Sequence, residues 1–452
     1  MLNIFSTEKL TFFKNRVKIN KKDLKDIAMT EKLFDFIENS PTAYHAVKSI
    51  EQRLISEGYT ELYESECAPL ADGGKYFIKR YDSSIIAFRY KKEYTGFTVC
   101  AGHSDSPAFR VKGNGETVGA YNRIMVERYG GSIFYTWLDR PLSVAGRLLV
   151  KKDGAIETVL TKPESDLLTI PSVCIHFNNK VNESATFDPK NDLLPLYSSK
   201  GECGEFMNTV AAAARVKRED IISHDLFVYN RERGRTVGRE GEFILSPRLD
   251  DLACVFAGLE GFLSATESSA IPVLAVFDNE EVGSSTKQGA ASSFLYDTLR
   301  RIAGDGVGAK LASSFMVSAD NAHARHPAHP ELSDKEFAPI LGGGVVVKYN
   351  ASQQYTTDGI SAAIFSGICE GAGVKTQTFY NRADLRGGST LGSIANTKVA
   401  MPTVDIGLAQ LAMHSANETA SARDLNDMCL VMRELFSSAV ITRGTSYKVV
   451  KE

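Results

Sequence analysis

Short runs of apolar residues recur along the chain, and several of them end just before polar residues that can take part in chemistry. The runs are Phe97–Cys100, Val273–Phe277 and Phe315–Val317, and the polar residues that follow them are His103, Asp278 and Asp320. Continuous apolar runs of this length are typical of strands buried on both faces of a sheet. Ligands of α/β proteins gather at the carboxyl ends of such strands, so the polar residues are candidates for a functional site.

Helical patterns lie between the runs. Apolar residues recur at helical spacing over 252–263 and 424–436, which predicts two amphipathic helices. A third pattern, over 31–57, is interrupted at Ser40-Pro41. We therefore expect two helices there, the second with Ser40 as its cap and Pro41 at its first position. Together these elements predict an α/β core with a mixed, largely parallel sheet flanked by helices.

The stretch from residue 111 to 245 differs, because it is rich in glycine, aromatic residues and alternating patterns. Within it, Gly146–Leu160 predicts a β-hairpin that turns at Asp153-Gly154. Polar candidate residues lie on both sides of the stretch. We therefore expect residues 111–245 to form a β-rich domain inserted into a first domain of residues 29–110 and 246–452. Residues 1–28 are expected to be an N-terminal arm, lying on the surface or on a neighbouring subunit.

Length, composition and charge exclude several classes of function. A chain of 452 residues favours two domains. The net charge of −3 gives no basic field for nucleic acid or an anionic membrane. We find no apolar stretch long enough to span a bilayer and no convincing signal peptide. Seven scattered cysteines without CxxC spacing argue against disulfides and a thiolate zinc site. They favour a reducing compartment, so we expect the cytoplasm.

Five histidine and carboxylate residues fall at expected element ends, and these residue types bind hard or borderline divalent metals. They are His103, Asp250, Glu281, Asp320 and His414. Each has an ordinary alternative when taken alone. His103 can be a surface residue, Asp250 a helix N-cap with Arg248 solvated beside it, and Glu281 part of a solvated acidic turn. His414 can be an ordinary loop residue, but it precedes Ser415–Glu418, which matches a capping box at a helix start and would hold it rigidly. Their shared position at element ends favours one common site.

Three neighbours of these residues suggest supporting roles. In an extended segment His103 and Asp105 lie on one side, so that Asp105 can accept the second imidazole N–H and fix the tautomer. The adjacent side chains of Glu280 and Glu281 point in different directions, so one can bind a metal while the other acts as a general base. We interpret the histidines at 323, 326 and 329 as part of a mobile polar loop, because the prolines between and after them prevent a shared helical face.

Beyond these residues, the chain resembles the metallopeptidase family of aspartyl aminopeptidase and yeast vacuolar aminopeptidase I, as a bacterial-type member. The resemblance spans about residues 34–437 and implies a zinc-exopeptidase fold with an inserted dimerisation domain. It implies a hydrolase that removes the N-terminal residue, acidic or neutral, from small peptides. The matching stretches are FIENSPTAYHAV, AGHSDSP, YGGSIFYTWLDRPLSVAGR, IPSVCIHFNNKVNE, SPRLDDL, FDNEEVGS, SADNAHARHP, GGGVVVKYNASQQY and DIGLAQLAMHS.

The resemblance also implies two zinc ions per subunit, with cobalt or manganese tolerated in their place. Carried over by position, Asp250 bridges the two ions. His103 and Asp320 complete one site, while Glu281 and His414 complete the other. Glu280 is then the general base for a two-metal-activated water, and Asp105 orients His103.

Further residues match family positions around the substrate. His176 corresponds to a catalytic and substrate-binding histidine that reaches the active site of a neighbouring subunit. Its alternatives are a buried core imidazole or a zinc ligand alongside His103 and His414. Lys348 corresponds to a lysine able to face a substrate carboxylate, and its alternative is an ordinary solvated lysine. The other candidates in pocket-forming stretches are Tyr355, His323, Asp384, Gly388 and Ser389.

The resemblance implies self-association into a tetrahedral homododecamer that admits only small peptides. Two departures concern the site. Asp251 follows the bridging position, where the family commonly has Asn, and it can strengthen the metal site or face solvent. The stretch 381–390 (NRADLRGGST) also differs from the family pattern, which leaves the choice between acidic and neutral substrates open. The alternative functions are a dinuclear carboxypeptidase or deacylase, and a catalytically inactive shell-forming scaffold.

Overall fold

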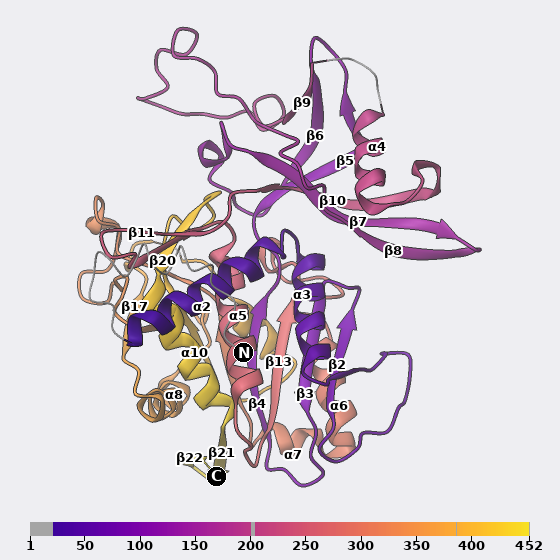
Figure 1. The fold of residues 1–452 in the computed structure, drawn as a ribbon. Coiled ribbons are helices and arrows are strands. Elements are labelled where there is room, and N and C mark those ends of the chain that lie inside the picture. Colours follow the sequence, from indigo (N-terminus) through magenta and orange to yellow (C-terminus); the bar gives the residue numbers. More distant parts are fainter. Residues whose placement is uncertain (1–20, 200–203, 386, 452) are drawn as a thin grey trace.

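The computed structural model describes residues 21–199, 204–385 and 387–451, and a nine-stranded sheet forms its centre (Figure 1). Residues 1–20 of the expected N-terminal arm lie outside the described residues. In spatial order the strands are β1 (Thr60–Glu61), β2 (Lys75–Arg80), β3 (Ser84–Arg89), β13 (Ile271–Phe277), β4 (Phe97–His103), β14 (Phe315–Ala319), β18 (Thr403–Gly407), β16 (Val345–Tyr349) and β17 (Thr376–Tyr380).

The four central strands, β13, β4, β14 and β18, all run parallel. Of the eight neighbouring pairs in the sheet, five are parallel and three antiparallel. The expected mixed, largely parallel sheet is therefore confirmed. Phe277 pairs with His103, so that β13 and β4 end side by side. Asp320 follows β14, the next strand. The polar residues that follow the apolar runs thus lie at one edge of the sheet.

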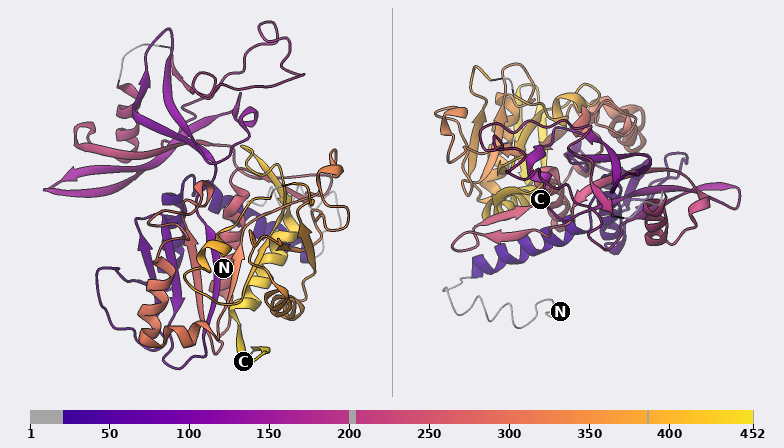
Figure 2. Two further views of the ribbon diagram at one scale, coloured as in Figure 1. Left: turned by 180° about the vertical axis from the view of Figure 1, so that it is seen from behind. Right: turned by 90° about the horizontal axis from the view of Figure 1, so that it is seen from above.

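Helices cover both faces of this sheet, which makes a three-layer α/β/α core (Figures 1 and 2). Alternate residues of β13 point to opposite faces of the sheet. Leu274 and Val276 pack against one helical layer, and Val273 and Ala275 pack against the other. The first layer contains α2 (Lys21–Glu38), α3 (Ala43–Ser56), α5 (Leu249–Ser264), α8 (Gly359–Ala372) and α10 (Ala422–Phe436). The second contains α6 (Phe294–Ala303), α7 (Val307–Leu311) and α9 (Leu391–Ala395).

A separate six-stranded antiparallel sheet lies above the large sheet in Figure 1 and has its own apolar core. The predicted hairpin is confirmed, since Lys152 pairs with Ala155 and both turn residues have positive φ. In order the strands are β8 (Ala155–Thr161), β7 (Leu142–Lys152), β10 (Ile221–Asn230), β5 (Ala108–Thr117), β6 (Asn122–Tyr129) and β9 (Leu196–Ser198), with helix α4 (Glu205–Ala214) packed against them.

Two smaller sheets complete the described chain. The first links β11 (Arg235–Val237), β12 (Phe243–Ser246), β20 (Glu418–Ser421), β19 (Ala409–Leu411) and β15 (Ala322–His323). The second is a hairpin of β21 (Ser438–Arg443) and β22 (Ser446–Lys451). Strands β11 and β12 fall inside the expected insert but pair outside the six-stranded sheet. The insert boundaries at 111 and 245 stay a prediction.

Two helix starts differ from our expectations. Helix α3 begins at Ala43 with Thr42 at the N-cap position, so neither Ser40 nor Pro41 has its predicted place. Residues 415–418 form no helix start, because Glu418 begins β20 and Ser421 caps α10 by accepting a hydrogen bond from the Asp424 N–H. The Glu418 carboxylate instead binds backbone N–H groups elsewhere in the chain.

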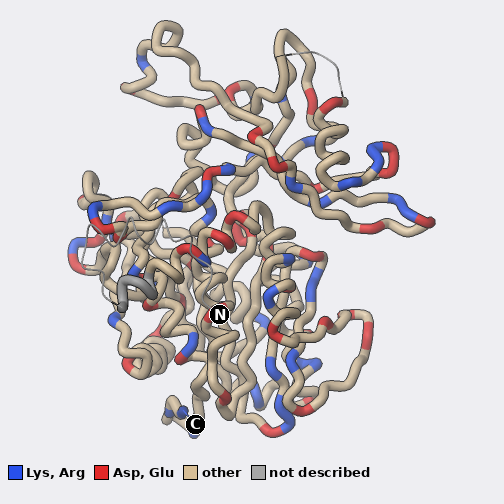
Figure 3. Tube along the Cα trace, viewed as in Figure 1, with Lys and Arg blue, Asp and Glu red and all other residues tan. Residues whose placement is uncertain are grey.

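Charged residues of both signs are distributed along the chain. Lys, Arg, Asp and Glu are interspersed along the traced chain in Figure 3, as its small net charge allows. In the described ranges, the helices are all too short or too polar to traverse a bilayer.

The contact between α5 and α10 generates a stability prediction. A Cβ added at Gly261 of α5 would lie 2.4 Å from Met432 Cβ. Gly261→Ala should therefore lower the thermal midpoint, since overpacking typically costs about 1–3 kcal/mol. In the matched control Gly367→Ala, the residue is exposed and its nearest neighbour is Val449 Cγ2 at 3.7 Å. There the better helix propensity of alanine, about 1 kcal/mol, should raise the midpoint. Thermal unfolding followed by circular dichroism would contradict the packing argument if both variants shifted in the same direction.

Candidate metal centre

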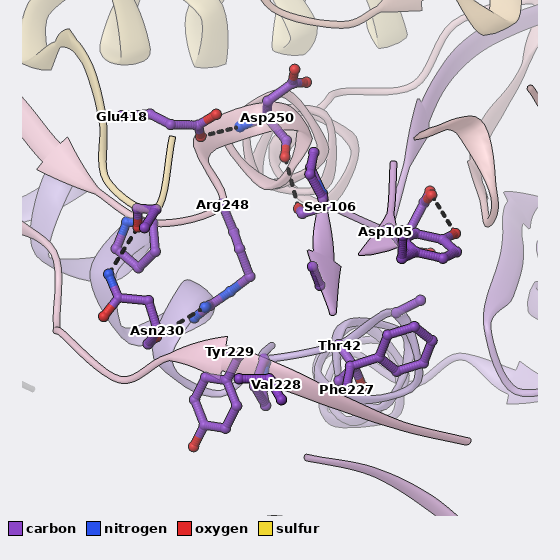
Figure 4. A pocket seen from close by; sticks show the side chains of 18 of the residues that line it. Thr42, Asp105, Ser106, Phe227, Val228, Tyr229, Asn230, Arg248, Asp250 and Glu418 are labelled. Carbon is purple, nitrogen blue, oxygen red and sulfur yellow. Dashed lines mark hydrogen bonds between the residues drawn. The ribbon is translucent and has the colours of Figure 1, made fainter. Parts of the chain in front are cut away.

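Asp250 lies at the centre of the site, at the start of α5, where its backbone departs from helical geometry. Its N–H donates to Glu418 Oε2 over 3.0 Å, and its carbonyl accepts a hydrogen bond of 2.7 Å from Ser106 Oγ (Figure 4). These two contacts fix the backbone and leave the carboxylate available. The N-cap interpretation of Asp250 is wrong, because Arg248 occupies the N-cap position of α5.

Each oxygen of the Asp250 carboxylate faces a different imidazole. Oδ1 lies 3.5 Å from His103 Nε2, and Oδ2 lies 3.5 Å from His414 Nε2. His103 ends β4, whereas His414 lies between β19 and β20, more than three hundred residues later in the chain. A carboxylate held between two imidazole nitrogens has the geometry of a bridging ligand.

Potential ligands form two groups that share Asp250. The first, fully buried, contains His103, Asp250, Asp251 and Asp320, and the second contains Asp250, Glu281 and His414. Within each group the ligand atoms lie within 4.8 Å of one another. All five sequence-predicted metal residues are thus brought together.

The chemistry of these groups fits divalent cations. Asp250 Oδ1 and Glu281 Oε1 are buried and accept no hydrogen bond from the described residues. Buried carboxylate oxygens normally have a partner, because desolvation without one is costly. Imidazole nitrogens and carboxylate oxygens are the ligands that zinc and related ions accept. A cation in each group would satisfy the orphaned oxygens.

The second nitrogen of each histidine faces an oxygen. His103 Nδ1 lies 3.1 Å from the Asp105 carbonyl oxygen and 3.4 Å from Asp105 Oδ1, and His414 Nδ1 lies 3.1 Å from the Gly131 carbonyl oxygen. Such contacts favour a proton on Nδ1 and leave Nε2 free to bind a metal. His103 Nδ1 thus lies nearer to the Asp105 carbonyl oxygen than to the Asp105 carboxylate, and the orienting role of this side chain stays a prediction.

Glu280 and Glu281 follow β13 in a 3₁₀ turn and differ in their surroundings. Glu281 Oε2 lies 3.4 Å from His414 Nε2, whereas Glu280 belongs to neither ligand group of the described chain. Burial raises the pKa of Glu280 to about 8; the charges of Asp320, Asp105 and Asp250 act in the same direction, against that of His103. The interpretation of this pair as a solvated acidic turn is wrong.

Lys348 is buried beside the first ligand group rather than solvated. It is 1% exposed, and its Nζ donates to the carbonyl oxygens of Asp320 (2.7 Å) and Asn321 (3.2 Å). The same ammonium lies 3.6 Å from Asp320 Oδ2, where it partly balances the clustered carboxylates. The ring of Tyr355 lies beneath it, 5.1 Å from Nζ to the ring centroid. The solvated-lysine interpretation is therefore wrong.

Asp251 and Arg248 do not face solvent in the way that one interpretation of each residue expected. Asp251 is fully buried and accepts a hydrogen bond of 3.2 Å from the His103 backbone N–H through Oδ2, so it does not face solvent. Arg248 donates to the carbonyl oxygens of Asn230 (3.2 Å) and Ile37 (3.1 Å), and Figure 4 shows it reaching toward Asn230. Arg248 therefore links the start of α5 to β10 and α2.

The remaining histidines lie outside the two ligand groups. His176 is exposed in the long loop between β8 and β9, which projects from the six-stranded sheet away from the large sheet (Figure 1). Its buried-core interpretation is wrong, and within this chain it does not join His103 and His414. His323 is exposed at the end of β15. His326 and His329 are also exposed, with ring centroids 5.3 Å apart, and join no ligand group of the described residues.

Sequence reasoning missed three contributors to the site. Tyr129 donates from its hydroxyl to Asp105 Oδ2 over 2.7 Å, Ser106 holds the Asp250 carbonyl, and Glu418 holds the N–H groups of both Asp250 and His414. Two of them could have been found from their closeness in sequence to candidate residues, since Ser106 follows Asp105 directly and Glu418 lies four residues after His414. Tyr129 had no such signal, because only the fold brings it to Asp105.

Comparison with known proteins identifies the family of the chain. A family model described as aminopeptidase I zinc metalloprotease (M18) matches residues 36–436. The "Probable M18 family aminopeptidase 2" of Clostridium acetobutylicum is 42% identical over 416 residues, which cover 88% of this chain and 96% of that protein. The protein of the same name from Pseudomonas aeruginosa is 36% identical over 423 residues, covering 91% of this chain and 98% of its own.

A solved structure is similar over the same range. The S. cerevisiae mApe1 dodecamer aligns with a TM-score of 0.80 at 26% identity, covering 90% of this chain and 96% of the mApe1 chain. Family model, curated relatives and fold all agree. The chain therefore belongs to the M18 family of zinc metalloproteases and is a metal-dependent aminopeptidase.

Proposed function

We propose that the chain uses two metal ions to remove the N-terminal residue, acidic or neutral, from small peptides. The observation that carries this proposal is the Asp250 carboxylate, whose two oxygens each lie 3.5 Å from a different histidine nitrogen. We assign His103 and Asp320 to one ion, Glu281 and His414 to the other, and Asp250 to both. Zinc is the expected metal, and cobalt or manganese suits the same nitrogen and oxygen ligands.

Bound ions would supply a water of lowered pKa and an electrophile for the scissile carbonyl. The protein itself would then have to transfer the proton of the attacking water and keep the metal-binding side chains in position. We assign proton transfer to Glu280, which takes the proton of the attacking water and delivers it to the leaving amine. Asp105 accepts the Glu280 N–H over 3.1 Å and so positions this base. Lys348 holds Asp320 through its carbonyl and balances its charge.

We assign substrate selection to the surroundings of Lys348, Tyr355 and His323, together with His176 of a neighbouring subunit. Support comes from the loop that carries His176, where Phe177 is 87% exposed and Ile175 is 50% exposed. Exposed apolar side chains that gather in one patch commonly mark an interaction surface. Because the similar mApe1 is a dodecamer, we propose a tetrahedral homododecamer built through the inserted sheet, working on small peptides in the cytoplasm.

The division of labour between the two glutamates gives a sharp test. Glu280→Gln should keep two metal ions per chain but lose most turnover, since a missing general base costs roughly 10²–10⁴-fold. Glu281→Gln should instead lower metal occupancy, because a ligand is lost. Elemental analysis and turnover of an aminoacyl chromogenic substrate distinguish the two variants. Identical behaviour of both variants would refute the assignment.

The reaction itself is tested with a panel of Asp, Glu, Leu, Ala and Lys substrates, each with zinc, cobalt and manganese. We expect hydrolysis only of substrates with a free amine, and little or none of their N-acetylated counterparts. Equal cleavage of acetylated peptides would favour the carboxypeptidase or deacylase alternative. Complete inactivity of metal-loaded protein would favour the scaffold alternative, although His103, Asp250, Glu280, Glu281, Asp320 and His414 are all present.

A further inference from the structure

The segment Tyr129–Gly131, at the end of β6 in the six-stranded sheet, contacts both halves of the proposed metal centre. The Tyr129 hydroxyl donates to Asp105 Oδ2 over 2.7 Å, and the Gly131 carbonyl oxygen lies 3.1 Å from His414 Nδ1. Asp105 in turn lies against His103 Nδ1. One short segment therefore supports both proposed histidine ligands, although neither histidine belongs to the sheet that carries it.

On the first side, the position of the Tyr129 hydroxyl is set by the six-stranded sheet. The Tyr129 ring packs edge-on against Phe227 of β10, with ring centroids 5.4 Å apart. Its hydroxyl also accepts a hydrogen bond of 2.8 Å from Asn279 Nδ2. Asp105 Oδ2 accepts the Glu281 N–H over 3.1 Å as well. A shift of the sheet would thus disturb Asp105, whose carbonyl oxygen (3.1 Å) and Oδ1 (3.4 Å) both face His103 Nδ1.

On the second side, the loop that carries His414 is held by the same sheet domain. The His414 carbonyl accepts from Ile133 N–H over 3.0 Å. Ala416 donates to Thr136 Oγ1 over 2.9 Å and accepts from Asn230 Nδ2 over 2.8 Å. The chain also passes close to Glu281, since a Cβ added at Gly130 would lie 3.2 Å from Glu281 Cβ. The loop therefore depends on the sheet for its position.

We propose that Tyr129–Gly131 is a positioning element through which the six-stranded sheet sets the metal affinity of the active site. The proposal rests on the ligand set of the proposed function. Groups that hydrogen-bond the second nitrogen of a metal-binding histidine, directly or through a carboxylate, fix its tautomer and orientation. Thermodynamic coupling is reciprocal, so metal binding should also stabilise the docked position of the sheet.

The test compares Tyr129→Phe with Tyr197→Phe. The first removes the hydroxyl bound to Asp105 and keeps the ring on Phe227. The second removes a hydroxyl of the same domain that lies 2.9 Å from Thr209 Oγ1, away from the ligands. Zinc affinity is measured by competition with a chromophoric chelator. Loss of a residue that supports a ligand typically costs 10–100-fold in metal affinity. We expect Tyr129→Phe to bind at least one zinc about 10-fold more weakly or worse, and Tyr197→Phe to bind like wild type.

Two further readouts separate positioning from misfolding. Excess zinc should restore turnover to Tyr129→Phe, and both variants should show wild-type secondary structure by circular dichroism. In wild type, zinc should slow amide hydrogen exchange over 129–136 relative to chelator-treated protein. Wild-type zinc affinity in Tyr129→Phe, or an equal loss in Tyr197→Phe, would overturn the coupling while leaving the proposed function intact. A wild-type chain that binds none of zinc, cobalt and manganese stoichiometrically would overturn both.

Discussion

The sharing of Asp250 between two histidines is the constraint on which the rest of the structure depends. Its two carboxylate oxygens need partners from distant parts of the chain, His103 at the end of β4 and His414 beyond β19. His103 is positioned by the parallel strands that end at one edge of the large sheet. His414 is positioned by the small sheet that contains β19 and β20. The hydrogen bonds from Ser106 and Glu418 then hold the Asp250 backbone, so that only its carboxylate is free to bind.

The carboxylates of this cluster are buried close together, and their charges need to be balanced. Burial raises the pKa values of Asp251, Glu281 and Asp320, because their charged forms lose hydration and repel one another. The buried ammonium of Lys348 offsets only part of that charge. Divalent cations would balance the remaining negative charge. Burying so many carboxylates is unfavourable without such ions, so the cluster suits a metalloenzyme. Metal binding and folding of the site are therefore linked.

The sequence predicts the central sheet because its strands are locally encoded. The apolar runs ending before His103 and Asp320 specify buried strands and the edge where the site forms. Contacts between distant segments are not encoded in this way. Glu418 resembled half of a capping box, yet its carboxylate binds the N–H groups of His414 and Asp250. Lys348 resembled a solvated residue after a strand, yet its ammonium binds backbone carbonyls near Asp320.

The same reasoning explains how two adjacent glutamates can have different roles. A single carboxylate, Asp105, accepts the N–H of Glu280 through Oδ1 and that of Glu281 through Oδ2, each over 3.1 Å. It also lies 3.4 Å from His103 Nδ1 and binds the Tyr129 hydroxyl. With both backbone groups fixed, the side chains diverge, one toward His414 and one outside the ligand groups. Asp105, a single buried residue, thus contacts the proposed base, the proposed ligands His103 and Glu281, and the six-stranded sheet. A displacement of any one of these groups would therefore be transmitted to the others.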